Sequence, residues 1–185
     1  MSLVAVVGLT ACGVMPPPGF PRAHHVDIEQ FMGPWYVIAH IPPSKTENAY
    51  NALECYALVE PGKIATVFTY REGSFDGERL TMKPTGHVVE GTGNAIWAME
   101  FFWPIKLQYV ITHVGRDYET AIVARSDLDY AWIMARTPKI PASIYADLVE
   151  RLAALGYDMP QLREVPQQPL DQRDDGCPRA RAIPR

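Results

Sequence analysis

The chain has 185 residues, of which 48% are hydrophobic and 21% are charged, so a single domain with a sizeable apolar core is expected. Its formal net charge is −4, which argues against nucleic acid as a partner because phosphate binding needs a basic surface. No uncharged apolar run approaches the roughly 18 residues that a membrane-spanning helix needs.

The first segment of the chain has the pattern of an export signal. Residues 3–12, LVAVVGLTAC, carry no charge and are too short to cross a bilayer, but they suit the apolar region of a secretion signal. Their end, Leu9-Thr10-Ala11-Cys12, resembles a bacterial lipobox. This resemblance implies a lipoprotein signal peptide at residues 1–11, lipidation of Cys12 by acyl chains such as palmitate, and anchoring to a membrane surface. An apolar tail with a chance cysteine is the alternative, since the expected basic residues before it are missing.

Gly13 follows the cysteine, and by resemblance to bacterial lipoproteins a non-acidic residue there implies the outer membrane and its periplasmic face. Residues 12–25 hold three consecutive prolines and predict an extended, semi-rigid tether. The adjacent pair His24 and His25 makes a poor metal site without further ligands, so no metal is expected. Export would also place the remaining cysteines in an oxidising compartment. A disulfide between Cys55 and Cys177 is then favoured, with two free thiols as the alternative.

Short apolar segments separated by turn residues follow from Pro34 onward, and helical periodicity is absent from them. Their order along the chain is 35–41, 53–59, 63–71, 79–83 with 87–90 as one strand bent at 84–86, 95–102, 106–114, 118–125 and 130–137. In the segment 95–102 both faces are largely apolar, because Trp97 and Met99 alternate with Ile96 and Ala98. The pattern favours an all-β fold, an eight-stranded antiparallel up-and-down barrel, with a two-sheet sandwich as the competitor.

One α-helix is predicted after the strands, packed on the outside of the barrel. Pro141 suits its first turn and Gly156 its end. Its apolar face consists of Ile144, Leu148, Leu152 and Leu155, spaced at i, i+4, i+8 and i+11. Residues 160–166 are compatible with a short further strand, and residues 168–185 predict an irregular tail because they are polar and rich in proline.

Three motifs in order show a family resemblance. Gly33-Pro34-Trp35-Tyr36 opens the first strand, VGRDYETAIV at 114–123 joins two late strands, and DYAWIMARTP at 129–138 precedes the helix. Together they resemble the lipocalins, and most of all the bacterial lipocalins of the apolipoprotein D-like branch. MEFFWPIKLQYVI at 99–111 is also similar to that branch. The resemblance covers residues 26–167 and implies a barrel that is closed at one end and open at the other.

The resemblance assigns structural roles to five residues. It implies that Trp35 plugs the closed end, that Gly33 lets the chain turn sharply into the barrel, and that the Arg136 guanidinium lies across the Trp35 ring. Asp117 and Tyr118 belong to the turn between the two late strands. None of these residues is therefore expected to contact a ligand.

Two positions depart from the pattern of the branch. Gly115 stands where the branch usually has aspartate, so this turn is expected to be built differently. Glu54 stands where a small neutral residue is usual. A Glu54 that faces the cavity would either select against fatty-acid anions or carry a proton, because burying an unpaired carboxylate is costly. A position on the outside is the alternative.

The resemblance implies a fatty acid, a lysophospholipid or a similar amphiphile as the guest of the open end. The candidates for the cavity lining are aromatic, aliphatic or Met side chains on the inward faces of the strands, which suits an elongated apolar guest. They are Tyr56, Leu58, Trp97, Met99, Phe101, Tyr109, Ile111, Trp132 and Met134. The sequence alone does not separate a hollow interior from a filled one.

Two functions therefore compete. One is transport or storage of an amphiphile by an anchored lipoprotein, and the other is a structural role in envelope assembly with a filled barrel. Neither a Gly-x-Ser-x-Gly elbow nor a His-Glu-x-x-His motif is present, and His40, His87 and His113 are scattered, so an enzyme is not expected. Haem-binding and enzymatic lipocalins are the less favoured alternatives. No cofactor is expected, and a homodimer stays open.

Overall fold

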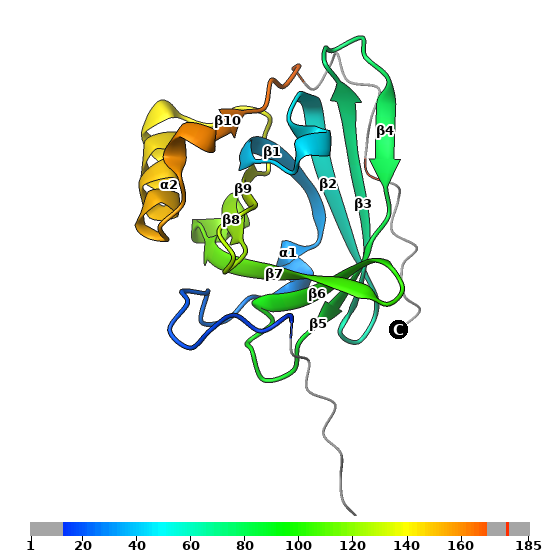
Figure 1. Cartoon of the computed structure of the whole chain (residues 1–185), viewed down its shortest axis with the longest axis vertical. Coiled ribbons are helices and arrows are strands. Elements are labelled where there is room, and N and C mark those ends of the chain that lie inside the picture. Colours follow the sequence, from blue (N-terminus) through cyan, green and yellow to red (C-terminus); the bar gives the residue numbers. More distant parts are fainter. Residues whose placement is uncertain (1–12, 170–176, 178–185) are drawn as a thin grey trace, which may run out of the picture.

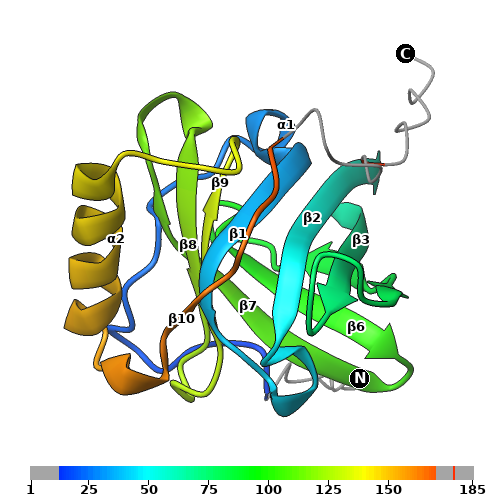
Figure 2. The same ribbon diagram turned by 90° about the horizontal axis from the view of Figure 1, so that it is seen from above.

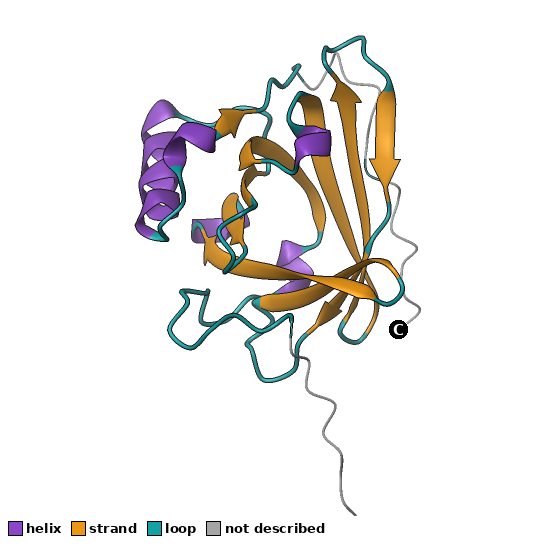
Figure 3. Ribbon diagram, in the orientation of Figure 1, coloured by secondary structure: helices purple, strands orange, loops and turns teal. Residues whose placement is uncertain are grey.

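The structure is a computed structural model that describes residues 13–169 and Cys177. β-Strands make up most of its regular secondary structure (Figure 3). The strands are β1 (Gly33–Ile41), β2 (Ala49–Glu60), β3 (Lys63–Glu72), β4 (Arg79–Met82), β5 (Thr85–Val88), β6 (Ile96–Phe102), β7 (Ile105–Val114), β8 (Thr120–Ala124), β9 (Ala131–Ala135) and β10 (Arg163–Glu164). Two α-helices, α1 (Ile28–Phe31) and α2 (Ala142–Ala154), accompany them, with short 3₁₀ turns at Ser44–Thr46, Arg116–Tyr118 and Met159–Gln161.

The sheet is antiparallel and closes on itself, because β1 pairs with β2 on one side and with β9 on the other (Figure 1). β4 and β5 both pair with β3, through residues 68–71 and 63–65 respectively, so they occupy one position in the barrel. This is the single strand, bent at residues 84–86, that the sequence predicts. The predicted all-β, eight-stranded barrel is confirmed, and the two-sheet sandwich is not formed.

β1 changes partners halfway along. Its first half, Gly33–Tyr36, pairs with β2, whereas Ala39 and His40 pair with the short strand β10. The segment after β10 continues along the same gap, where Asn51 donates its N–H to the Pro166 carbonyl. Figure 2 shows the C-terminal segment running between β1 and β2. The chain end therefore helps to close the barrel wall, and the short strand expected within 160–166 is present.

Helix α2 covers the outside of the barrel, as the sequence predicts (Figure 1). Leu148 and Leu152 are fully buried against the outward faces of β1, β8 and β9. The prediction for Ile144 was wrong, because this side chain is 43% exposed. The helix is turned so that Tyr145 and Val149 pack on the barrel instead. No helix among the described residues is long and apolar enough to cross a membrane.

Residues 13–25 lie against the barrel, in contrast to the free tether that their prolines predict. Val14 is buried with Ile96 and Val110 on the outer faces of β6 and β7, and Phe20 packs beside it. Ala23 also donates its N–H to the Ile111 carbonyl at 2.9 Å. Burial of these apolar side chains stabilises the packed arrangement by more than the preference of the prolines for an extended backbone opposes it. The expected signal peptide 1–11, Cys12 and most of the tail 168–185 fall outside the described residues.

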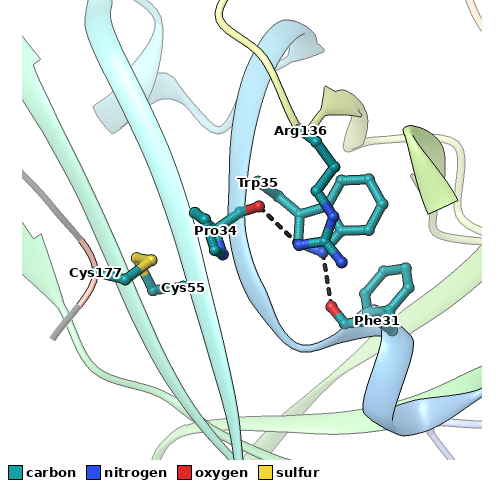
Figure 4. The surroundings of a disulfide bond; sticks show 6 residues. All are labelled: Phe31, Pro34, Trp35, Cys55, Arg136 and Cys177. Atoms are coloured by element: carbon teal, nitrogen blue, oxygen red, sulfur yellow. Dashed lines mark hydrogen bonds between the residues drawn. A yellow bond between two sulfur atoms is a disulfide. The ribbon is translucent and has the colours of Figure 1, made fainter. Parts of the chain in front are cut away.

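Cys55 and Cys177 form a disulfide that spans 122 positions of the sequence. Cys55 lies on the outward face of β2, buried with Tyr36 and Leu53 (Figure 4). The disulfide is therefore formed, and the alternative of two free thiols is not. It fixes the end of the chain to the barrel wall beside β1.

Candidate ligand cavity

Trp35 fills the closed end of the barrel. Its side chain is fully buried, and its Nε1 donates a hydrogen bond to the Phe31 carbonyl at 2.8 Å. The Arg136 guanidinium carbon lies 3.8 Å from the centre of the Trp35 ring, which is the stacking that the family resemblance implies (Figure 4). Such a cation–π contact stabilises the fold by about 0.5–2 kcal/mol.

Arg136 ties three segments together at this end. It donates to the carbonyls of Pro34 at 2.8 Å, Gln30 at 2.5 Å and Tyr118 at 3.2 Å. Burial lowers the Arg136 pKa to about 10, so the guanidinium is still charged at neutral pH. Gly33 turns the chain here with φ +91°, a conformation that disfavours other residues. These contacts hold the closed end of the barrel together.

The turn between β7 and β8 joins the same closed end. Asp117 and Tyr118 both have φ +58°, and the Tyr118 hydroxyl accepts a hydrogen bond from the Asp27 N–H at 2.7 Å. A Cβ added to Gly115 would lie 2.3 Å from the Thr120 Oγ1, so a larger residue would require the Thr120 side chain or the turn to shift. This close approach is consistent with the expectation from the sequence that the turn is built differently here.

A cavity of about 240 Å³ occupies the barrel interior on the side away from Trp35. It is smaller than the roughly 300–1,000 Å³ typical of drug-sized ligand sites, which favours a slender guest. Its lining is mostly apolar and comes from β2, β3, β4, β6, β7, β9 and the loops at the open end. The lining consists of Pro43, Thr46, Glu54, Tyr56, Phe68, Met82, Pro84, Met99, Phe101, Leu107, Gln108, Tyr109, Arg125, Tyr130, Trp132 and Met134.

Six of the nine candidates from the sequence line this cavity: Tyr56, Met99, Phe101, Tyr109, Trp132 and Met134. The other three, Leu58, Trp97 and Ile111, do not line it and pack around Trp35 at the closed end. Each of the three shares a strand face with a lining residue but lies closer to the closed end. Strand alternation predicts which face a side chain occupies, but not its depth in the barrel.

Several lining residues were missed by the sequence analysis. Pro43 and Thr46 lie in the β1–β2 loop, and Arg125 and Tyr130 flank the β8–β9 turn, so all four come from irregular segments at the open end. Phe68 lies within β3 and shares one strand face with Ile64 and Tyr70, so alternation was an available sequence signal for it. Loop residues carry no such periodic signal.

Two tyrosine hydroxyls meet at the inner end of the cavity. Tyr56 Oη and Tyr109 Oη are 2.7 Å apart, a hydrogen bond in which either can be the donor. The Tyr109 ring is stacked on Trp97 with the ring centres 5.0 Å apart. Burial raises the pKa of both tyrosines well above 10, and the nearby Glu54 adds to this. Both hydroxyls are therefore neutral over the physiological pH range.

Glu54 faces the cavity from β2, next to this hydroxyl pair, so the alternative of an external position is wrong. Its Oε2 is enclosed and has no hydrogen-bond partner among the described residues. The part of the side chain that is still accessible faces the cavity. Burial raises the Glu54 pKa from 4.5 to about 8, so this carboxyl is mostly protonated at neutral pH.

The open end of the barrel carries a cation and exposed aromatics. Arg125 lines the cavity and is held by Asp129 at 2.8 Å and Asp127 at 3.1 Å. At the tip of the β6–β7 hairpin, Phe102 and Trp103 are 65% and 82% exposed. This end of the barrel thus combines a compensated arginine with exposed apolar surface.

Histidines do not assemble a catalytic or metal site in the described part of the chain. His40, His87 and His113 lie on β1, β5 and β7, and none of them lines the cavity. Groups of three or more His, Cys, Asp or Glu that could hold a metal are absent from the described residues. No other reactive constellation accompanies the cavity there.

Stability should fall between pH 6.5 and pH 8, and Glu54 should be the cause. A carboxyl with a raised pKa favours folding below pH 4.5, and this contribution is lost as the pH rises through about 8. Burial lowers the pKa of His40 to about 4 and also that of His113, so these groups oppose Glu54 only below pH 6.5. We expect the free energy of unfolding to drop by about 2 kcal/mol over this interval.

Urea unfolding at pH 6.5, 7.2 and 8 measures this dependence. Glu54→Gln should remove most of the slope, because the amide does not titrate. An equal slope in the variant would show that other groups cause it.

A family match agrees with this architecture. Residues 26–167 match the lipocalin-like domain family. The chain is 25% identical over 147 residues to the outer membrane lipoprotein Blc of Escherichia coli, covering 78% of this chain and 81% of Blc. It is 26% identical over 159 residues to apolipoprotein D of Mus musculus, covering 81% and 82% of the two chains. The resemblance that the sequence motifs indicate is therefore confirmed.

Solved structures show the same fold. Insecticyanin of the tobacco hornworm Manduca sexta matches with a TM-score of 0.62 at 15% identity, over 83% of this chain and 86% of that chain. The closed eight-stranded barrel, the outer helix and an apolar cavity in the barrel interior are the architecture of this fold. The chain belongs to the lipocalin-like family, whose members typically bind small hydrophobic ligands and are generally binding or transport proteins.

Proposed function

We propose that this protein binds one small hydrophobic or amphiphilic molecule in its barrel cavity and carries or stores it without chemical change. The observation that carries the proposal is the cavity itself, an apolar space of about 240 Å³ that lies beyond a fully packed closed end. Burial of a guest against this lining would contribute about 25 cal/mol per Å² of apolar area. Fatty acids and lysophospholipids are the ligand classes that the family resemblance implies.

The presence of the cavity is evidence against the alternative, a structural lipoprotein with a filled barrel. A filled interior would leave no accessible space beside Met99, Met134 and Tyr109. These three residues pack on the closed end and also border the cavity of about 240 Å³. The scattered histidines likewise give no support to an enzymatic or haem-binding role.

We also place the protein at the periplasmic face of the bacterial outer membrane, anchored through Cys12. The supporting observations are the lipobox-like stretch and the relatives named outer membrane lipoprotein. Other relatives, such as mouse apolipoprotein D, are not bacterial. Labelled palmitate should be incorporated into the native chain and not into Cys12→Ser. Equal labelling of both chains would refute the anchor.

Native mass spectrometry tests whether the barrel is loaded in the cell. The chain should carry Cys12→Ser, so that neither an anchor nor a detergent is needed. We expect part of the purified protein to carry one added mass in the range of a small lipid. Unfolding in acid and solvent should release that mass. Protein of unmodified mass alone, together with failure to take up an apolar dye, would contradict the proposal.

A further inference from the structure

Glu54 is the one acidic side chain among the residues that line the described cavity. It lies at the inner end, directly opposite Trp35 of β1 and Phe68 of β3 in the strand register. Its Oε2 is enclosed and makes no hydrogen bond within the described part of the protein. A buried polar atom without a partner costs about 1–3 kcal/mol, so a guest that supplies the partner is favoured.

Among the described residues, no cation is paired with the Glu54 carboxyl. From β2 and β7 it faces the hydroxyls of Tyr56 and Tyr109, which bind each other and are neutral. Trp35 and Phe68 from β1 and β3, and Met99 from β6, do not titrate. The arginines at the two ends of the barrel, Arg136 and Arg125, are engaged elsewhere.

Arg136 lies under the Trp35 ring and donates to three carbonyls, and Arg125 at the open end is bound by two aspartates. Burial alone is the cause of the shifted Glu54 pKa, with no contribution from a cation. The inner end of the cavity therefore offers an acid that lacks a counter-ion.

We propose that Glu54 makes the cavity select amphiphiles whose inner end is a primary amine over amphiphiles that end in a carboxylate. This inference rests on the proposed function, because it assumes that the cavity binds an apolar guest. An ammonium group brings three donors and the missing positive charge to the enclosed Oε2. A carboxylate brings a second negative charge to the same place, and the two acids can share only one proton.

The two guest classes should differ in the pH dependence of their binding. An ammonium binds the ionised Glu54, so the carboxyl proton is released to solvent. With a Glu54 pKa of about 8, amine affinity should rise about 50-fold between pH 6 and pH 8. A carboxylate binds the protonated form, so its affinity should be constant up to pH 7 and fall about tenfold by pH 9.

Competition with a neutral dye measures both dependences. The full chain with Cys12→Ser is loaded with N-phenyl-1-naphthylamine, and decylamine, decanoate and decanol are titrated as competitors from pH 6 to pH 9. We expect decylamine to displace the dye at an at least tenfold lower concentration than decanoate at pH 8. Decanol, which has the same tail and no charge, should change by less than about threefold between pH 6 and pH 8.

Glu54→Gln is the matched variant, since it keeps the shape and removes the titration. It should lose the rise of amine affinity with pH. Decanoate competing as well as decylamine at pH 8, or an unchanged pH dependence in the variant, would overturn the inference. If the variant fails to fold, the pH dependences of decylamine and decanoate binding to the native protein still test the inference.

Failure of the native cavity to bind the dye would have a different meaning. It would overturn the proposed function, and the inference with it. Dye binding that shows no preference for amines would overturn the inference alone.

Discussion

Trp35→Ala is expected to lower the free energy of unfolding by about 3–5 kcal/mol. The fully buried indole fills the closed end of the barrel against Phe31 and Tyr56, and its removal leaves a cavity that these rings cannot fill. The variant also leaves the Phe31 carbonyl without its donor and removes the aromatic face on which Arg136 lies. Urea unfolding monitored by circular dichroism measures the difference.

Trp103→Ala is the matched control, because Trp103 is 82% exposed on the β6–β7 hairpin. Its effect on the free energy of unfolding should stay within about 0.5 kcal/mol. Similar losses in the two variants would show that Trp35 does not close the barrel. A loss confined to Trp35→Ala would support its role as the plug.

Loss of the disulfide is expected to cost about 2–5 kcal/mol of stability. The bond closes a loop that spans 122 positions, and in the chain-entropy model such a loop corresponds to roughly 4–5 kcal/mol. It also holds the chain end near the gap in the wall between β1 and β2. Cys177→Ala, unfolded in urea beside the native protein, measures the loss.

A reductant provides the control for this variant. It should weaken the native protein by the same amount and leave Cys177→Ala unchanged, because the variant has no disulfide to break. A reductant effect in the variant would point to another cause. Equal stability of the two oxidised proteins would contradict the stabilising role of the bond.

The fold could be predicted from the sequence because its signals are local and repeated. Alternation of apolar residues gave the strands, and the spacing of Leu148 and Leu152 gave the face of α2. The packing of Val14 and Phe20 on the barrel could not be predicted, because proline-rich composition predicts backbone stiffness and not tertiary contacts. The same applies to Ile144, whose exposure depends on how α2 is rotated on the barrel.

The cavity could be predicted in part. Alternation identified inward faces, but the closed end takes the inward residues nearest to it, at the start of β6 and near the end of β7, so Trp97 and Ile111 became part of its packing. Glu54 shares the inward face of β2 with Tyr56, two positions away, and this alternation was a signal for its orientation. Its missing hydrogen-bond partner depends on side chains from other strands, which one sequence does not reveal.

The central claim is that the barrel encloses a ligand site, and a blocked cavity tests it most directly. Leu107 lines the cavity, and Leu107→Trp should fill it, whereas Val59→Trp adds the same ring at an exposed position on β2. Titration with N-phenyl-1-naphthylamine should show one saturable site in the native chain and in Val59→Trp. We expect at least a tenfold loss of dye affinity in Leu107→Trp. Equal dye binding by all three proteins would contradict a ligand site inside the barrel.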